Sequence, residues 1–206
     1  MILQDLKDRH KGEPVWVCGS GPSMDWVTPQ FFDDKVVVSI NDVGFWFGIA
    51  KFYSASNYSK ANPITGKRID ENPDCIFVTP DMDLEASDMT ATHVGSGNHI
   101  TFRPHAPFWR PDIGWPTDPD VLVIGGTSAH IAMHLACYMG ASQINLIGVD
   151  NGSIGGISNF GKYGDSKAIN PEGWSQWFPI VVNKLRELYG VRFFRLQPSL
   201  ELLVVE

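Results

Sequence analysis

Short apolar runs alternate with longer amphipathic segments along the chain. The runs rich in β-branched or aromatic residues predict buried strands at 15 to 18, 36 to 40, 52 to 55, 121 to 124, 143 to 149 and 191 to 196. Amphipathic segments predict helices up to Gly140 and up to Gly190, because glycine commonly ends a helix. Strands that alternate with helices predict an α/β fold, in which helices cover both faces of a mostly parallel sheet.

The helices can be predicted in more detail from the spacing of their apolar residues. In the β-α-β unit 121 to 150, Ile131, Leu135 and Met139 recur on one stripe that should face a core. For the helix at 174 to 189 the predicted inner stripe is Trp177, Ile180, Val181, Lys184, Leu185 and Leu188. Residues 1 to 12 are expected to form a short amphipathic helix or tail, ended by Gly12 and Pro14.

The segment from about 61 to 119 has a different sequence pattern, because prolines interrupt it repeatedly. Strands are predicted there only at 75 to 79 and 100 to 103. His93, His99 and His105 lack the compact spacing of metal ligands, so surface histidines are expected. The sequence therefore predicts one domain, residues 1 to 206, with an irregular insertion at about 61 to 119 and a glycine-rich lid at about 151 to 173.

Composition narrows the classes of partner. The 206 residues carry a formal charge of -7 without a cluster of Lys and Arg, which argues against nucleic-acid binding. Three scattered cysteines favour a reducing compartment over a disulfide framework. No apolar run approaches the length of a transmembrane helix, and the N-terminus does not resemble a signal peptide. We expect a soluble, cytoplasmic protein, and the sequence leaves a homo-oligomer open.

A candidate ligand site lies at the ends of the predicted strands. The first strand leads directly into Gly19, Ser20, Gly21, Pro22 and Ser23, a tight turn with a proline suited to the first position of a helix. The free N–H groups of a helix start can hold a phosphate, although a plain turn between strand and helix is an equally good interpretation.

Further polar residues follow other strands of the predicted sheet. Thr127 or Ser128 can cap the central helix. Asn41 and Asp42 follow the second strand, where they could contact a ribose or form an Asx turn, and Ser54 follows the third strand. The carboxyl ends of parallel strands meet at one edge of the sheet, which is where open α/β sheets bind ligands. The polar residues at this edge therefore predict a ligand cleft.

Asp150 ends the strand at 143 to 149 and leads into the lid. Asn151 follows it, and Lys162, Tyr163 and Lys167 on the lid could meet a phosphate, although a solvated loop explains them equally well.

A zinc site is an alternative use of the central helix. His130, His134 and Cys137 lie at i, i+4 and i+7 on one helical face. The glutamate of the HExxH motif is missing, and helices packed on sheets usually hold partly buried histidines with backbone partners. We therefore assign no metal ligands.

Several segments occur in a familiar order: CGSGPS at 18 to 23, Asn41, the run 127 to 150, and a final helix, strand and Pro-Ser at 174 to 199. Over about half of its length the chain resembles the bacterial sialyltransferases of glycosyltransferase family 42 and the related 6-hydroxymethyl-dihydropterin diphosphokinase-like family. This resemblance implies a Rossmann-like nucleotide-binding fold. It also implies that Gly19, Gly21, Asn41, Thr127 and Ser128 surround a cytidine nucleotide sugar.

The chain departs from that family at catalytic positions. Ser20 stands where the family has Asn, Asn151 and Gly152 replace a pair of tyrosines, and Gly173 stands at the position of the general-base histidine. Asp150 is then the best candidate for a catalytic base, with Asp165 second. Lys162 or Lys167 would stabilise charge on a leaving phosphate.

The resemblance implies a nucleotide-dependent transferase, most simply a sialyltransferase-like glycosyltransferase that takes a nucleotide-sugar donor and a small-molecule or glycan acceptor. No cofactor is certain. The diphosphokinase resemblance implies an alternative in which nucleotide phosphates and one carboxylate hold Mg²⁺. A nucleotide-binding module without catalytic activity is a third interpretation.

Overall fold

A single nine-stranded sheet forms the centre of the protein. The computed structural model describes residues 1 to 56, 63 to 80, 97 to 105, 115, 121 to 123, 127 to 150 and 177 to 205. In these residues the strand order is β6-β5-β4-β3-β2-β1-β7-β8-β9, and every pairing is parallel except that of β8 with β9. The strands are β1 Pro14–Cys18, β2 Val36–Ile40, β3 Tyr53–Ala55, β4 Ile76–Pro80, β5 His99–His105, β6 Val121–Val123, β7 Gln143–Ile147, β8 Arg192–Leu196 and β9 Leu202–Val204.

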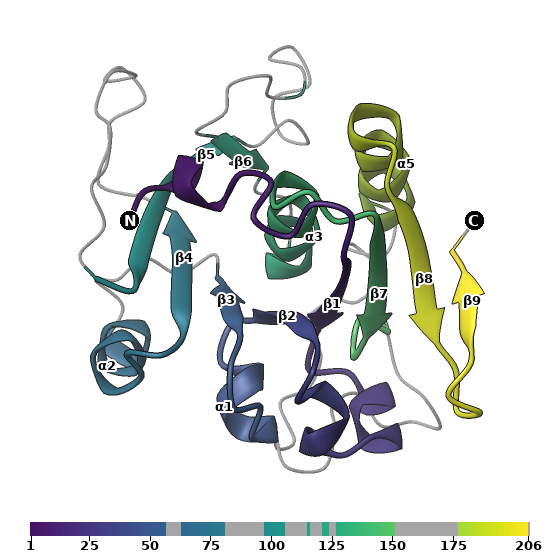
Figure 1. The fold of residues 1–206 in the computed structure, drawn as a ribbon, viewed down its shortest axis with the longest axis horizontal. Helices are drawn as coiled ribbons and strands as arrows, with labels where there is room; N and C mark the ends of the chain where they lie inside the picture. Colours follow the sequence, from purple (N-terminus) through teal and green to yellow (C-terminus); the bar gives the residue numbers. More distant parts are fainter. Residues whose placement is uncertain are drawn as a thin grey trace.

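Helices cover both faces of this sheet, so the predicted fold class is confirmed (Figure 1). The α-helices are α1 Val43–Phe47, α2 Pro63–Glu71, α3 Ser128–Tyr138 and α5 Trp177–Tyr189, and the 3-10 helices are η1 Leu3–Leu6, η2 Pro22–Trp26 and η3 Pro29–Phe32. Helices α3 and α5 lie on one side, whereas α1 and α2 lie on the other. Helices α1 and α2 and strand β9 were not predicted from the sequence.

Alternating side chains of the strands supply two hydrophobic cores. Along β1, Val15 and Val17 belong to the core under α3 and α5, whereas Trp16 and Cys18 belong to the core on the opposite face. This two-residue period follows from the pleat of a strand. Apolar runs without a polar face are therefore required here, since both faces of the central strands are covered.

Helix α3 is buried along its entire length. The spacing of its apolar residues predicted one buried stripe, but every residue from Ser128 to Tyr138 is buried. One side of α3 packs on the sheet and another on α5, and the N-terminal segment crosses it (Figure 1). The backbone N–H groups of Asp8 and His10 donate to the carbonyls of Tyr138 and Met139 at 3.1 and 2.8 Å. Burial on several sides explains why a single stripe was too narrow a prediction.

Two predictions about helices are refined by the structure. The segment at 1 to 12 contains only the 3-10 helix η1, because its backbone bonds to the end of α3 instead of continuing a helix. In α5 the buried residues are Phe178, Val181, Val182 and Leu185. The predicted stripe residues Ile180 and Leu188 are 47% and 43% exposed. Val181 and Leu185 of the predicted stripe are buried, but the buried face is shifted to include Phe178 and Val182, because packing on α3 and the sheet selects the face.

The two strands of the unit 121 to 150 are far apart in the sheet. Strand β6 lies beyond β5 at one edge, whereas β7 pairs with β1 near the middle. Helix α3 contacts β6, β3, β2, β1 and β7 as it connects these distant strands. The local sequence predicted the strands and the helix but could not specify which strands become neighbours.

The proline-rich segment contributes two strands to this sheet, as predicted, in β4 and β5. His99, expected at the surface, is buried, and its Nε2 lies 2.9 Å from Oγ1 of Thr79. The side chain of His105, and all of His93, lie outside the described residues.

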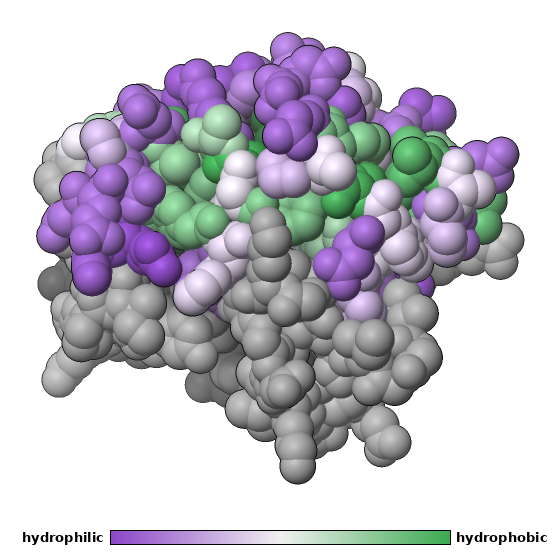
Figure 2. Space-filling model, turned by 90° about the horizontal axis from the view of Figure 1, so that it is seen from below, coloured by the Kyte–Doolittle hydropathy of each residue, from purple (hydrophilic) through white to green (hydrophobic). Residues whose placement is uncertain are grey.

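Seen from below, the side that carries α1, η2 and η3 shows a band of apolar residues beside hydrophilic ones (Figure 2). Val27, Phe31 and Phe45 are partly buried and pack onto the core of this side. None of the helices in the described part of the chain combines the length and the apolarity that a membrane crossing needs.

Candidate functional site

The order of the strands reverses between β1 and β7, which makes this point the topological switch of the sheet. From β1 the chain proceeds to β2 on one side, and after β6 it returns to the other side of β1. Open α/β sheets bind ligands at such a point, outside the carboxyl ends of the strands. The turn at Gly19 to Ser23 follows β1, and the segment at Gly148 to Asp150 follows β7, so both lie at this point.

Hydrogen bonds join these two segments closely. The N–H of Gly19 donates to the carbonyl of Ile147 at 2.8 Å, and that of Gly21 donates to the carbonyl of Gly148 at 2.7 Å. The hydroxyl oxygen of Ser23 accepts from the N–H of Gly148 at 2.6 Å. These contacts extend the pairing of β1 and β7 beyond the strands and fix the shape of the edge.

The glycines are needed because the two backbones approach so closely. Gly148 has a φ of 67°, a conformation that favours glycine, and a Cβ there would overlap the carbonyl of Gly19. A Cβ on Gly21 would overlap the carboxylate of Asp150. Gly148 was not among the predicted site residues. A glycine between an apolar strand and a terminal Asp was the signal that could have identified it.

Asp150 is tied to the turn after β1. Its Oδ2 accepts the backbone N–H of Ser23 at 3.0 Å, near the start of η2. This 3-10 helix has five residues, with Gly21 at the N-cap and Pro22 in its first turn, so the proline lies where expected but no α-helix follows. An N–H group that was expected to meet a ligand phosphate thus already holds a carboxylate. Asp150 therefore has a structural role in addition to any chemical one.

A second hydrogen-bonded group lies at the ends of β2 and β3. The Oδ1 of Asn41 accepts from the hydroxyl of Ser128 at 3.0 Å, although the two residues are 87 positions apart. The carbonyl of Asn41 accepts from the hydroxyl of Ser54 at 2.7 Å, and its N–H donates to the carbonyl of Ala55 at 2.9 Å. Three predicted site residues from separate segments are thus brought together.

The backbone of Asn41 has a φ of 53°, in the left-handed region. Asparagine tolerates this region better than most residues with a side chain, because its short amide can bond locally. This conformation turns the chain directly after β2. The side chain of Asn41 then points toward Ser128 at the start of α3. Local sequence thereby positions a side chain that polar ligands can use as donor and acceptor.

The remaining described candidates have mainly local partners. Thr127 caps α3, as predicted, since its Oγ1 accepts the N–H of Ala129 at 3.0 Å. The Oδ2 of Asp42 accepts from Nε1 of Trp46 at 2.8 Å, within α1. Ser20 is partly exposed in the turn after β1. One carboxylate oxygen of Asp42 is thereby held by α1.

The candidates on the predicted lid, Asn151, Lys162 and Asp165, lie outside the described residues, as do Tyr163 and Lys167.

The histidines of α3 have structural partners. The Nδ1 of His134 accepts the N–H of Val123 at 3.0 Å, so the ring proton is on Nε2 and faces the Tyr189 hydroxyl at 2.8 Å. Burial raises the pKa of Cys137 well above its usual value, which opposes the thiolate that a metal requires. Desolvation lowers the pKa of His130 to about 4. No group of three candidate metal ligands occurs among the described residues.

No protein-family model and no curated protein matches this chain. Its fold is similar to solved structures of the sialyltransferase CstII from Campylobacter jejuni. One, in complex with the substrate analogue cytidine-5'-monophosphate, has a TM-score of 0.51 and 17% sequence identity, over 92% of this chain and 82% of that one. Another, in complex with CMP-3FNeuAc, has a TM-score of 0.48 and 17% identity, over 91% and 82% of the two chains. The first of these matches supports the α/β fold assignment.

Proposed function

We propose that this protein binds a nucleotide sugar at the carboxyl edge of β1, β2 and β7 and acts as a sialyltransferase-like glycosyltransferase. The observation that carries the proposal is the location of the joined Gly19–Ser23 and Gly148–Asp150 segments at the switch point of the sheet. The similarity in fold to a sialyltransferase that is described with cytidine nucleotides supports the same proposal. The predicted acceptor is a small molecule or a glycan.

In this proposal Asn41 and Ser128 contact the ribose or the base, since their side chains offer both donors and acceptors. The turn after β1 faces the phosphate. Its glycines permit close approach of a ligand to the backbone, but the carboxylate of Asp150 already accepts the N–H of Ser23. A phosphate would therefore bind beside this carboxylate, using other donors such as the predicted lid residue Lys162.

Transfer of a sugar breaks the bond between its anomeric carbon and the donor phosphate, and forms a bond to an acceptor hydroxyl whose proton must be removed. Asp150 is the described carboxylate at this edge that could take the proton, with Asp165 as the second candidate. One oxygen of Asp150 holds Ser23, which would orient the carboxylate for this role. Any Mg²⁺ would bind through nucleotide phosphates and one carboxylate.

A nucleotide-binding protein without transferase activity is the second candidate. It is favoured by the hydrogen bond that gives Asp150 a structural task, and by Gly173 at the position where the resembled family has its histidine. Both candidates predict nucleotide binding at the same edge, so turnover is the property that separates them.

Binding is tested by thermal unfolding with CMP, CDP, UDP, GDP and ATP, each with and without Mg²⁺. A ligand at 100 times its dissociation constant should stabilise the folded protein by about 2.7 kcal/mol. Stabilisation by CMP or a CMP-sugar supports the proposal. No stabilisation by any nucleotide contradicts both candidates, and stabilisation by ATP with Mg²⁺ alone would favour a diphosphokinase.

The location of the site is tested with Asn41→Gly, which keeps the left-handed backbone and removes the amide. Loss of one hydrogen bond should weaken CMP binding about tenfold. Asp8→Gly is the matched control, because Asp8 also has a positive φ of 56° but lies in the N-terminal segment. Equal effects of the two substitutions would contradict the assigned location.

Catalysis is tested by release of CMP from a CMP-sugar donor, with and without acceptors. For an enzyme that uses Asp150 as base, Asp150→Asn should abolish release and keep CMP binding. Binding without release by the unmodified protein would identify the binding module instead.

A further inference from the structure

A trough lies at the amino ends of β2, β3 and β4. The candidate nucleotide site lies at the other ends of the strands, the carboxyl ends. Two adjoining hollows of about 740 and 540 Å³ share Arg9, Ala50, Lys51, Asp74 and Ile76 in their walls. The smaller one is also lined by His10, Asp33 and the first residues of the strands, Val36 and Tyr53. This position separates the trough from the switch point at the carboxyl ends, so a ligand there would occupy a different site.

The trough presents both signs of charge. Arg9 and Lys51 supply positive charge, and Asp33 and Asp74 supply negative charge, and none of the four forms an ion pair with another described residue. The remaining pair in the wall, Lys35 with Asp34, is already joined at 2.6 Å. Charges of both signs that are left available in one hollow can recognise a ligand that carries both.

Apolar side chains complete the wall of the smaller hollow. Phe32, Val37 and Phe52 line it and belong to the core on the side of α1. Ile76, at the start of β4, extends the apolar wall into both hollows. Ligand sites commonly combine mostly apolar walls with a few polar groups that fix orientation.

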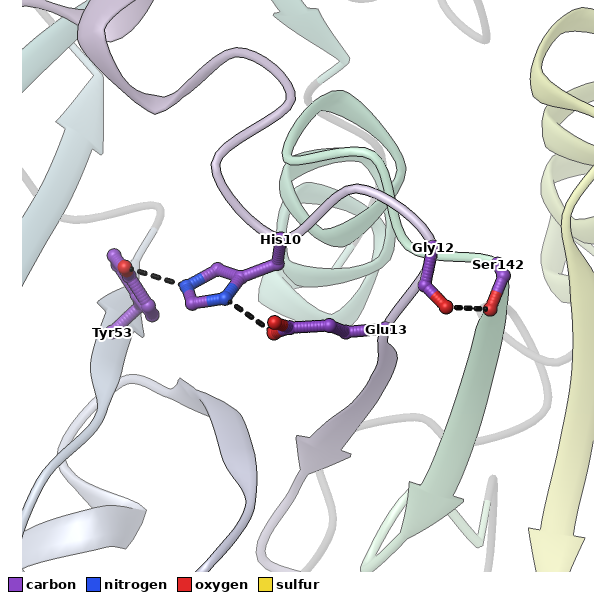
Figure 3. Close-up of polar contacts among 5 residues, drawn as sticks. All are labelled: His10, Gly12, Glu13, Tyr53 and Ser142. Carbon is purple, nitrogen blue, oxygen red and sulfur yellow. Dashed lines mark hydrogen bonds and ion pairs between the residues drawn. The ribbon is translucent and has the colours of Figure 1, made fainter.

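A hydrogen-bonded chain holds one polar group in this wall. The Nδ1 of His10 lies 2.8 Å from the Glu13 carboxylate, and its Nε2 lies 2.8 Å from the Tyr53 hydroxyl (Figure 3). A carboxylate can only accept, so Nδ1 is the donor to Glu13, and in a neutral ring Nε2 accepts the Tyr53 proton. Burial raises the pKa of Tyr53, which keeps this hydroxyl protonated. Its oxygen then has lone pairs that can accept from a ligand.

The segment that supplies Arg9 and His10 is fixed in place. The N–H of Gly12 donates to the carbonyl of Gly140 at 2.9 Å, and the hydroxyl of Ser142 donates to the carbonyl of Gly12 at 2.8 Å (Figure 3). The trough is therefore built on the ends of strands and on a segment whose backbone is anchored between α3 and β7, which fixes the backbone that carries Arg9 and His10.

We propose that this trough is a second ligand site, for a small zwitterion with a carboxylate, a protonated amine and an apolar body, the chemistry of an apolar α-amino acid. Arg9 and Lys51 bind the carboxylate, Asp74 and Asp33 bind the amine together with the Tyr53 oxygen, and the apolar wall contacts the side chain.

The test compares three probes that differ by one charged group: L-phenylalanine, 3-phenylpropionate without the amine, and phenethylamine without the carboxylate. Binding is followed by backbone amide shifts in two-dimensional NMR spectra of the full chain. L-Phenylalanine should bind at least about tenfold more tightly than either other probe, because one charge-assisted hydrogen bond supplies at least that factor. The shifts should centre on His10, Lys51, Tyr53 and Asp74.

Variants test which residues bind the carboxylate of the ligand and which bind its amine. Arg9→Gln with Lys51→Gln should weaken phenylalanine and phenylpropionate binding but not phenethylamine binding, whereas Asp74→Asn should show the reverse selectivity for the two single-charge probes. Lys7→Gln and Asp70→Asn are matched controls, because both residues are exposed and neither lines the trough. All these side chains are at the surface, so the variants should fold.

Three results would overturn the proposal. These are no saturable shift with any probe, equal binding of phenylalanine and a single-charge probe, or shifts that centre on Ser23, Asn41 and Ser128 at the other edge. Equal losses of binding in the control variants would also overturn the proposal, because the effect would then come from the change in the net charge of the protein.

Discussion

The backbone N–H of Ser23 donates to Oδ2 of Asp150 at 3.0 Å, across 127 positions of the sequence. This bond joins the turn after β1 to the end of β7 at the switch point of the sheet. The hydroxyl oxygen of Ser23 also accepts the backbone N–H of Gly148, so Ser23 bonds to two residues of the segment that follows β7. The shape of the candidate nucleotide site therefore depends on contacts between its own protein groups.

The first prediction concerns the stability that Asp150 contributes. Asp150→Ala leaves the Ser23 N–H without its carboxylate acceptor, and should lower the free energy of unfolding by about 1 to 2 kcal/mol. Asp150→Asn keeps an acceptor oxygen and should lose less than half as much. Urea denaturation measures both, and an Asn variant as unstable as the Ala variant would contradict the bond's assigned role.

The second prediction separates backbone strain from close packing. Gly148 and Gly190 have nearly the same φ, 67° and 66°, but a Cβ on Gly190 meets nothing within 4 Å. Gly190→Ala should therefore cost about 1 to 2 kcal/mol, the price of a left-handed alanine. Gly148→Ala should cost at least about 1 kcal/mol more, because overpacking against Gly19 and Met24 is added. Similar losses of unfolding free energy in the two variants would contradict the prediction, because they would show that the backbones after β1 and β7 can move apart without cost.

The third prediction is a loss of stability in acid that depends on His130. Burial lowers the pKa of this imidazole from 6.5 to about 4, so the unfolded chain takes up a proton at a higher pH than the folded one. The contribution of His130 is complete above pH 6.5 and falls by roughly 3 kcal/mol as the pH decreases to about 4. His130→Gln should flatten this part of the curve of unfolding free energy against pH. Parallel curves for the two proteins would contradict the prediction.

The fourth prediction concerns the thiols. Cys18, Cys75 and Cys137 are buried and free, and burial raises the pKa of each. Because the thiolate is the reactive form, a thiol reagent at neutral pH should label none of them rapidly in the folded protein and all three in urea. Asp34→Cys supplies a positive control, since the side chain of residue 34 is 84% exposed. Rapid labelling of the unmodified protein would contradict the burial of these residues.

The sequence by itself determined the elements whose signals are local. The apolar runs predicted strands β1 to β8, and the glycines at 140 and 190 correctly ended α3 and α5. Thr127 caps α3 as its sequence position indicates. Such features depend on a few adjacent residues, whose backbone preferences and periodicity can be evaluated without knowing the fold. The short elements α1 and β9 have too few residues to give a periodic signal.

The tertiary structure alone decided which elements are neighbours and what each polar group bonds to. The two strands of the β-α-β unit 121 to 150 follow one another along the chain, yet β6 and β7 lie far apart in the sheet. Ile180 has a helical spacing that suits a core, but α5 turns another face inward. The pairing of Asn41 with Ser128, and of Ser23 with Asp150, arises because strand order brings distant strand ends to one edge. Contacts of this kind depend on packing across the whole sheet, which no local pattern encodes.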